Sequence, residues 1–291
     1  MAYNNTQDFF HSSIDGTKLF YQSWQKVKPG TGRVMVFQHG FGEHSDRYGN
    51  LLDKFQNSDM NFYALDSRGH GRSEGKRGHV DQFQLYIDDL SDLIKIVKEK
   101  EKVQKVFLLG HSLGGVIVLQ YAIQGINQES LIALLVCSPA IKVKMNLDKQ
   151  IKKKIAGFLA NFFPAVTLDA GLDLKYLSND PSTIDAYKAD PLVHGKVSFQ
   201  MATNLFNLSR SIREKAGIIK VPVYLIHGSE DGIVDIEGSK ELYQHLIYKN
   251  KQFKIYQGLY HELMNETPEE REKVLSDLKN YVDSIMPEKL K

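Results

Sequence analysis

The stretch LLGHSLGGV, Leu108 to Val116, puts a histidine and a serine among glycines and apolar residues. The residues before it end in KVFLLG, a β-branched and leucine-rich run that is typical of a buried strand. The residues after it, GGVIVLQYAIQG, are long and apolar enough for a buried helix that ends at Gly125. We therefore expect Ser112 at a sharp turn from a strand into a helix.

The spacing Gly110-x-Ser112-x-Gly114 matches the pattern of a nucleophile elbow. In such a turn the serine adopts a strained conformation, and its hydroxyl projects above the sheet. Glycine is expected two residues before and after it, because a side chain there would collide with the crossing strand and helix. The alternative is a phosphate-binding glycine loop. We favour the elbow, because the chain has no G-x-x-x-x-G-K-[ST] and GRSEGKR at Gly71 has the wrong spacing.

The rest of the chain alternates strand-like and helical segments. Two strand-like runs flank Asp15-Gly16, a good hairpin turn. Further strands are predicted at RVMVFQ, MNFYAL, KVFLLG, LIALLVC, VPVYLIHG and KQFKIYQG. Helices are predicted over 83–98, directly after Ser112, over 236–247 and over 268–285. This alternation predicts an α/β fold whose mostly parallel central sheet is flanked by helices.

Residues 142–220 interrupt this alternation. They lack long β-branched runs and look helical, in LDKQIKKKIAGFLANFFP, STIDAYKADPL and VSFQMATNLFNLSRSIREKAG. Ligands of open α/β sheets bind beyond the carboxyl ends of the strands, so an insertion between two strands is well placed to cover a site. We interpret 142–220 as a helical cap, inserted between two core segments, 1–141 and 221–291.

One segment of this predicted cap combines an apolar helical stripe with lysines. The stripe has the spacing i, i+4, i+7, i+8 and i+11. Its residues are Ile151, Ile155, Phe158, Leu159 and Phe162, and the lysines are Lys149, Lys152, Lys153 and Lys154. Three interpretations stay open: packing on the body, lining an acyl tunnel, or contact with a membrane surface. We favour tunnel lining over membrane contact.

A serine nucleophile needs a base, and the base needs an orienting carboxylate. In the fold that carries the elbow, the acid and then the histidine follow the serine in the chain. Asp231 follows the strand VYLIHG, and His261 follows the strand FKIYQG, so both are expected at the sheet edge that carries Ser112. The neighbours Glu230 and Asp235 are alternatives for the acid. His227 lies inside a strand and is interpreted as a structural hydrogen-bonding residue.

The oxyanion of an acyl-transfer intermediate needs two backbone N–H donors. One is expected from Leu113, directly after the nucleophile, and the other from the loop after an early strand. The segment QHGFGEHSDRY supplies that loop, and its turn at His39-Gly40 is expected to aim the N–H of Phe41 at the same oxygen.

Composition narrows the class of protein. The 291 residues are 42% apolar and 25% charged, which is ordinary for a globular chain, and the net charge is +2. This charge is too small, and the basic residues are too widely spread, to indicate a nucleic-acid partner. The histidines lack a convincing zinc-ligand spacing, so no metal or other cofactor is predicted.

The cysteine content and the termini bear on location. Cys137 is the single cysteine, which rules out an internal disulfide, fits a reducing compartment and is expected to be a small buried hydrophobe. The N-terminus lacks the basic and apolar regions of a signal peptide. No apolar run approaches the roughly 18 residues of a transmembrane helix. We expect a soluble, cytoplasmic protein.

Several of these motifs together resemble the monoacylglycerol lipase and lysophospholipase group of α/β-hydrolases. HGFGEHSDRY, DSRGHGRSEG and GHSLGG are similar to motifs of that group, and GSEDGIVD and YHELMNE resemble the regions that carry its acid and base. The resemblance runs from about residue 37 to the last helix. It implies a triad of Ser112, Asp231 and His261 and an oxyanion hole at Phe41 and Leu113.

The resemblance also implies a pocket for the alcohol end of the substrate near Glu43, Arg47 and His111. Alternatively, Glu43 and Arg47 only pair with each other and hold their loop. Two departures stand out: Leu113 replaces a methionine, and Thr183 stands where an acidic residue that helps to bind glycerol is expected. The second departure weakens the assignment to monoacylglycerols without affecting the triad.

The sequence thus predicts a serine carboxylester hydrolase that acts on single-chain acyl esters through an acyl-enzyme, first of all on a monoacylglycerol. A lysophospholipase is the nearest alternative, and it is favoured by Thr183 and the lysines of the predicted cap. A broader carboxylesterase, a thioesterase and an amidase share the same machinery. A non-catalytic hydrolase-fold protein that binds a lipid belongs to another class. The oligomeric state stays open.

Overall fold

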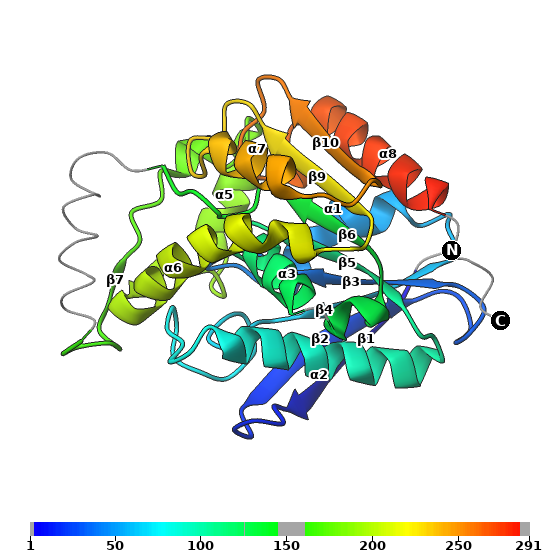
Figure 1. Ribbon diagram of the computed structural model, residues 1–291, viewed down its shortest axis with the longest axis horizontal. Coiled ribbons are helices and arrows are strands. Elements are labelled where there is room, and N and C mark those ends of the chain that lie inside the picture. The colour runs from blue at the N-terminus through cyan, green and yellow to red at the C-terminus, as the bar shows by residue number, and fades with distance from the viewer. Residues whose placement is uncertain (1–2, 125, 145–160, 286–291) are drawn as a thin grey trace.

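An eight-stranded sheet runs through the protein, which a computed structural model describes for residues 3–124, 126–144 and 161–285. The strand order is β1-β2-β4-β3-β5-β6-β9-β10 (Figure 1). The strands from β4 to β10 in this order are parallel, whereas β2 is antiparallel to both β1 and β4. The strands are β1 (Asn4–His11), β2 (Lys18–Gln25), β3 (Arg33–Gln38), β4 (Met60–Leu65), β5 (Val106–His111), β6 (Leu131–Cys137), β9 (Val223–Gly228) and β10 (Lys251–Tyr256).

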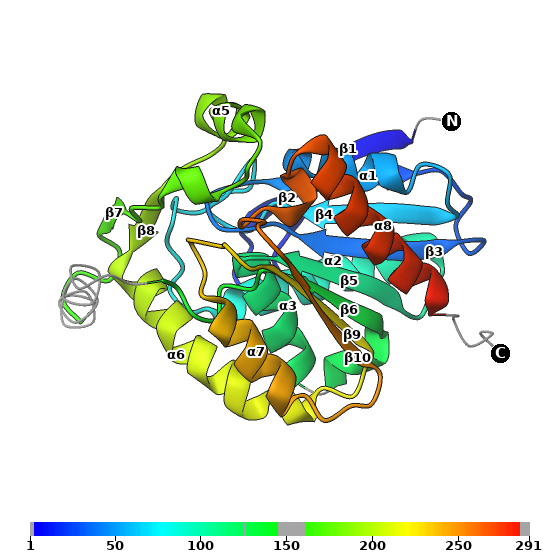
Figure 2. The ribbon, with the colours of Figure 1, turned by 90° about the horizontal axis from the view of Figure 1, so that it is seen from above.

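Helices cover both faces of this sheet (Figure 2). One face carries α1 (Gly49–Lys54) and α8 (Pro268–Ser284), whose apolar side chains share one buried cluster. The other face carries α2 (Gln84–Glu101), α3 (Leu113–Ile123) and α7 (Ile236–His245), whose side chains join a second cluster. The predicted α/β fold with a mostly parallel sheet is confirmed.

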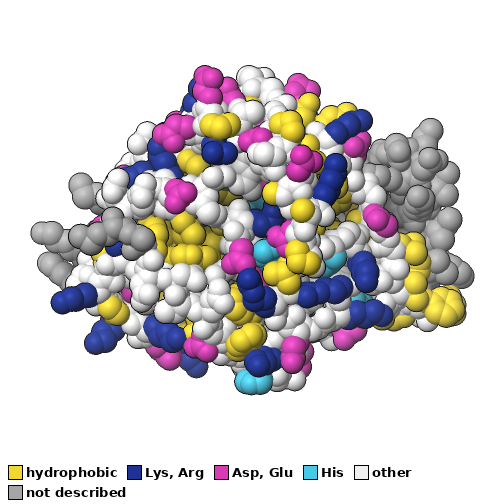
Figure 3. Space-filling model, turned by 180° about the vertical axis from the view of Figure 1, so that it is seen from behind, with side chains coloured by type: hydrophobic (Ala, Val, Ile, Leu, Met, Phe, Trp, Pro, Cys, Tyr) yellow, Lys and Arg dark blue, Asp and Glu magenta, His cyan; other side chains and the backbone are white. Residues whose placement is uncertain are grey.

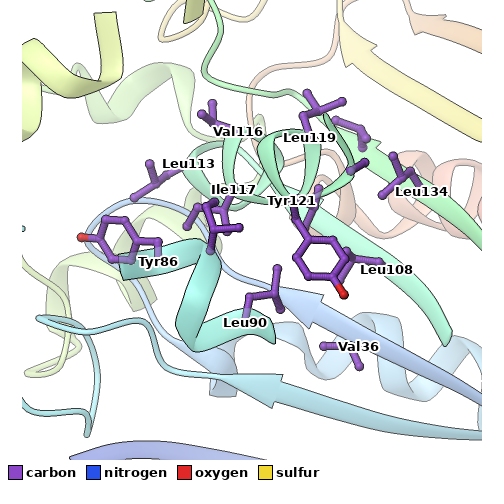
Figure 4. Close-up of a cluster of buried hydrophobic side chains, with 14 of the residues drawn as sticks. Val36, Tyr86, Leu90, Leu108, Leu113, Val116, Ile117, Leu119, Tyr121 and Leu134 are labelled. Carbon is purple, nitrogen blue, oxygen red and sulfur yellow. The ribbon is translucent and has the colours of Figure 1, made fainter. Parts of the chain in front are cut away.

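Helix α3 packs on the sheet beside α2, within the second cluster (Figure 4). Every residue of α3 except Gln120 is buried. Val116 and Ile117 belong to the same buried cluster as Leu108 of β5 and Leu90 of α2. Burial of each such side chain contributes about 1.5–3 kcal/mol. The position of α3, and hence of the residue at its N-terminus, is therefore firmly fixed.

The elements predicted from periodicity are found close to their expected ends. The hairpin at Asp15-Gly16 joins β1 and β2, and α8 covers nearly all of the predicted residues 268–285. Helix α2 extends to Glu101 rather than Lys98, and Lys102 ends it in the left-handed conformation with φ +54°. Its N–H bonds back into the last turn of the helix, which stops further growth.

Residues 142–220 leave the sheet after β6 and return to it at β9. Helices α5 (Pro181–Ala189) and α6 (Phe199–Lys215) confirm two of the predicted helical stretches. The stretch predicted to start at Val197 is wrong for its first two residues, because β7 (Thr167–Asp169) and β8 (Lys196–Ser198) form a small antiparallel pair. Ser198 then caps α6 by accepting the N–H of Met201.

The predicted amphipathic stripe falls largely outside the described residues. This applies to Ile151, Ile155, Phe158 and Leu159 and to the lysines at 149 and 152–154. None of the described helices is long and apolar enough to span a bilayer.

Candidate active site

Ser112 stands alone between β5 and α3 in a strained backbone conformation, with φ +53° and ψ −114°. A positive φ in a residue other than glycine costs about 1–3 kcal/mol and often marks a functional site. A Cβ atom on Gly110 would lie 2.4 Å from the carbonyl oxygen of Gly114, and one on Gly114 would lie 2.1 Å from the carbonyl oxygen of Gln38. Both distances are impossible, which confirms the predicted steric reason for the two glycines.

The residues predicted as nucleophile, base and acid form one hydrogen-bonded chain. Ser112 Oγ lies 2.9 Å from His261 Nε2, and His261 Nδ1 lies 2.7 Å from Asp231 Oδ2. All three residues are buried. Since the carboxylate accepts the proton of Nδ1, the lone pair of Nε2 faces the serine hydroxyl. The geometry suits the transfer of the serine proton to the imidazole.

The loop after β9 selects Asp231 among the three acidic candidates. Its Oδ1 accepts the N–H groups of Ile233 and Val234, both at 2.8 Å, which leaves Oδ2 for His261. Asp235 instead caps α7 by accepting the N–H of Glu237, and the side chain of Glu230 is exposed. Neither alternative is in contact with the imidazole in the described structure.

The electrostatics of the pair fit this chemistry. Burial alone would raise the pKa of Asp231, but the imidazoles of His261 and His227 outweigh it and hold the pKa of Asp231 far below its usual range. Burial alone would lower the pKa of His261, but the Asp231 carboxylate outweighs it and raises the pKa of His261 above 6.5. The acid therefore stays ionised and stabilises an imidazolium next to Ser112.

Glu43 and Arg47 are paired, but within a larger cluster than the sequence suggested. Arg47 Nη1 lies 2.6 Å from Glu43 Oε2, and the guanidinium also binds both carboxylate oxygens of Glu262, at 2.6 and 2.8 Å. Glu43 Oε1 accepts the N–H of Gly40 at 2.6 Å. Burial opposes the charge of Glu43, but Arg47 outweighs it and lowers the pKa of Glu43 to about 2. One guanidinium thus joins the loop after β3 to the loop of His261.

His111 lies against the candidate base, with its ring centroid 4.8 Å from that of His261. Burial and the neighbouring His261 lower the pKa of His111 to about 4, so its ring is neutral at physiological pH. Its buried Nδ1 has no hydrogen-bond partner within the described structure. A buried polar atom without a partner is a candidate for contact with a ligand.

A mostly apolar cavity of about 150 Å³ opens at Ser112 and His261. Gly40, Phe41 and His111 line the end next to the serine. The apolar walls come mainly from residues 142–220 and from the loop after β9, and include Leu172, Leu177, Val197, Leu205, Ile233 and Val234. The N–H of Leu113 is the first of α3 and has no partner within that helix, so it is available to an oxygen beside Ser112.

The segment 142–220 is also tied to the loops that carry the candidate residues. The N–H groups of His261 and Glu262 donate to the carbonyl oxygens of Tyr176 and Leu177, at 3.1 and 2.8 Å. On the other side of the site, the N–H of His194 donates to the carbonyl oxygen of Gly42 at 2.9 Å. Residues of the segment 142–220 thus hold both loops next to Ser112.

Two residues next to the Ser–His–Asp chain were not predicted from the sequence to take part in the site. Glu262 is separated from Arg47 by 215 positions, and no local pattern signals their contact. His227 does make the structural hydrogen bond expected of it, to Ser239 at 2.8 Å, but it also approaches the candidate acid. Cys137 is buried, as predicted. Across the described ranges, no group of three or more His, Cys, Asp or Glu side chains is placed to hold a metal ion.

The fold and the Ser–His–Asp chain define an α/β-hydrolase. Residues 30–268 match the family model described as serine aminopeptidase, S33, and the chain belongs to this family of serine hydrolases. It is 32% identical to a monoacylglycerol lipase of Mycolicibacterium smegmatis, over 98% of this chain and 99% of the relative. It is 33% identical to a monoglyceride lipase of Rattus norvegicus, over 95% and 90% of the two chains. The chain is thus a carboxylic ester hydrolase.

Solved structures of monoacylglycerol lipases are similar to this protein over nearly its whole length. The crystal structure of a Paleococcus ferrophilus monoacylglycerol lipase aligns with a TM-score of 0.80 at 30% identity and covers 97% of this chain and 100% of that one. A soluble variant of the Saccharomyces cerevisiae monoglyceride lipase, in complex with a substrate analog, aligns with a TM-score of 0.85 at 26% identity and covers 99% and 97%.

Proposed function

We propose that this protein hydrolyses monoacylglycerols, with Ser112 as nucleophile, His261 as general base and Asp231 as the orienting acid. The observation that carries the proposal is the hydrogen-bonded chain of these three residues, whose Ser112 and His261 line a mostly apolar cavity. The named lipases among the relatives support the same substrate class. Residues 142–220 act as the cap that supplies most of the apolar wall.

The reaction runs in two halves. Ser112 Oγ attacks the ester carbonyl carbon and passes its proton to Nε2 of His261, while the Asp231 carboxylate stabilises the imidazolium. The N–H groups of Leu113 and Phe41 bind the oxyanion of the tetrahedral intermediate. The intermediate collapses, and His261 protonates the leaving glycerol oxygen. Water then attacks the acyl-enzyme while His261 takes its proton. The second tetrahedral intermediate collapses, the bond to Ser112 Oγ breaks, His261 returns the proton to this oxygen, and the fatty acid leaves.

The alcohol end of the substrate lies beside the cluster of Glu43, Arg47 and Glu262 and the ring of His111. Two carboxylates surround one guanidinium, so the cluster carries an excess of negative charge. Such a surface favours the uncharged hydroxyls of glycerol over a phosphodiester, whose charge it would repel. A glycerol hydroxyl can also satisfy the unpartnered Nδ1 of His111.

A lysophospholipase is the rival, and the position of Thr183 favours it. Thr183 Oγ1 donates to the carbonyl oxygen of Asn265 at 2.8 Å, so its hydroxyl is engaged away from the cavity lining. Because threonine has no carboxylate, this position offers the hydroxyls of a glycerol head group no acidic contact.

The test compares fatty-acid release from a monoacylglycerol and from a lysophosphatidylcholine of equal chain length, with Ser112→Ala alongside. We expect faster release from the monoacylglycerol and no release by the variant. Faster release from the lysophospholipid would move the rival into first place. Absence of Ser112 labelling by a fluorophosphonate in folded protein would contradict the serine mechanism and favour a non-catalytic lipid-binding role.

The cap also offers a surface for contact with a membrane. Phe163, Val166 and Leu168 are 57%, 45% and 56% exposed and follow closely on the lysine-rich stretch of the sequence. Hydrophobic side chains gather beside the larger grey segment in Figure 3. Apolar burial together with attraction to anionic lipid headgroups would hold the cap at a bilayer surface, where a single-chain ester partitions.

A further inference from the structure

A second histidine, besides His261, contacts the carboxylate of the candidate acid Asp231. His227 is the penultimate residue of β9, four positions before Asp231, and its side chain is fully buried. Its Nε2 lies 3.2 Å from Oδ2 of Asp231, the same oxygen that accepts the Nδ1 proton of His261. No hydrogen bond of regular geometry reaches this Nε2 within the described residues. The carboxylate is thus the polar contact available to a buried ring nitrogen.

The other ring nitrogen fixes the direction of this contact. His227 Nδ1 lies 2.8 Å from Oγ of Ser239, a fully buried residue in the first turns of α7. If the serine hydroxyl donates to Nδ1, the ring proton lies on Nε2, next to the carboxylate. In the opposite tautomer, the lone pairs of Nε2 and Oδ2 would face each other at 3.2 Å, which is repulsive. The contacts therefore select the tautomer with a proton on Nε2.

We propose that His227 is a positioning residue for the triad: its Nε2–H, oriented by Ser239, donates to Oδ2 of Asp231 and sets how strongly this oxygen binds His261. The chain of contacts then runs from Ser239 in α7 through His227, Asp231 and His261 to Ser112. His227 touches no substrate atom in this arrangement and acts only through Asp231. The inference rests on the proposed roles of Ser112, His261 and Asp231, not on the identity of the ester.

The physical effect follows from the sharing of one oxygen. A second donor at Oδ2 stabilises the ionised carboxylate and reduces its attraction for the proton on His261. Oδ1 stays held by two backbone N–H groups, so loss of His227 leaves the carboxylate in place but makes it a stronger acceptor. The pKa of His261 then rises. The other groups around His261 are Glu43, Glu262 and His111, and the change does not touch them.

A purely structural role makes a different prediction. If His227 only fills space under α7, any substitution that fits the cavity changes stability alone. Two variants separate the roles. His227→Phe keeps a planar ring and removes both nitrogens, whereas His227→Gln keeps an N–H donor at about the position of Nε2.

The experiment measures the second-order rate of Ser112 phosphonylation by a fluorophosphonate as a function of pH, together with thermal unfolding. In this reaction Ser112 Oγ forms a bond to phosphorus, fluoride leaves and His261 takes the serine proton, so the acid limb reports its ionisation. We expect the limb of His227→Phe to move to higher pH by about 0.5–1 unit, and that of His227→Gln to stay near the original value. Equal profiles of the two variants, or a shift to lower pH, would overturn the proposal.

A measurement on the unaltered chain keeps the proposal testable if His227→Phe does not fold. The ¹⁵N shifts of His227 should be of the protonated type at Nε2 and of the unprotonated type at Nδ1, and the reverse pattern would refute the proposed donor. Failure of the unaltered protein to react with the fluorophosphonate would instead contradict the proposed serine mechanism. The two ideas therefore fail on different observations.

Discussion

Two flanking glycines permit the left-handed backbone conformation of Ser112, which residues other than glycine rarely adopt. The serine has a positive φ, and the Cβ positions of Gly110 and Gly114 are closed mainly by main-chain atoms, which cannot move aside as the end of a side chain could. The sequence pattern predicted this turn in full, because the collision depends only on local spacing and on the crossing of a strand by a helix. The strain is held by the buried helix α3 that follows.

Gly114→Ala should therefore destabilise the protein strongly. Its Cβ would lie 2.1 Å from the main-chain oxygen of Gln38, which cannot rotate away, so we expect a loss of about 3 kcal/mol in the free energy of unfolding. Gly49→Ala is the matched control. A Cβ there meets no atom within 4 Å, and we expect the stability to be unchanged or raised by up to about 1 kcal/mol. Urea unfolding of both variants measures the difference, and equal losses would contradict this steric account.

The ionisation of His261 sets the acid limb of activity. The base must be neutral to take the serine proton, and the Asp231 carboxylate raises the pKa of His261 above 6.5. Activity is therefore expected at a pH above this raised pKa and is lost as the pH falls through it. A pH profile of kcat/KM should place the acid limb above pH 6.5, the ordinary value for histidine. A limb below that value would contradict the ion-pair electrostatics described for His261 and Asp231.

At the scale of elements, the contacts between distant loops are what the sequence could not reveal. Periodicity predicts a strand or a helix from neighbouring residues, and so the sheet strands and the helices α2, α3, α7 and α8 were found. The pairing of β7 with β8 joins two three-residue runs about thirty positions apart, and neither run carries a period of its own. The same holds for Arg47 and Glu262, which meet only after the sheet has formed.

Arg47→Ala tests how much that loop-to-loop contact contributes. The substitution leaves the buried carboxylates of Glu43 and Glu262 without their shared cation, and loss of one partner of a buried ion pair costs about 3–5 kcal/mol. Arg210 is the control, because its pair with Glu214 is exposed, and in urea unfolding Arg210→Ala should leave the midpoint unchanged. If both substitutions changed the urea midpoint equally, the cluster would have no special role in stability.

At the scale of the whole molecule, the order of motifs along the chain predicted which strands carry the site. Parallel strands end at one edge of the sheet, so residues after β5, β9 and β10 were expected to meet there, and Ser112, Asp231 and His261 do so. The cap could be placed only as a segment between strands. How its residues close over the cavity depends on contacts such as that of Tyr176 with the His261 loop, which leave no periodic signal.

The exposed apolar residues of the predicted cap lead to the last prediction, on membrane contact. The double variant Phe163→Ser, Leu168→Ser should reduce binding to vesicles of phosphatidylcholine and phosphatidylglycerol by about tenfold or more, because each large apolar side chain that enters the interface contributes about 1.5–3 kcal/mol when fully buried. Cosedimentation measures the bound fraction. Activity on a dispersed short-chain ester should stay unchanged, since neither residue lines the cavity.

Ile247→Ser provides the control, because Ile247 is 66% exposed and lies outside residues 142–220. We expect this substitution to leave vesicle binding intact, since only the apolar residues next to the lysine-rich stretch are proposed to enter the bilayer. Added salt should weaken the binding of the unaltered protein, because lysines act on anionic headgroups through a screened attraction. Equal binding by the control and the double variant would contradict this membrane contact, and Phe163 and Leu168 would then play no part in how a substrate at a bilayer reaches Ser112.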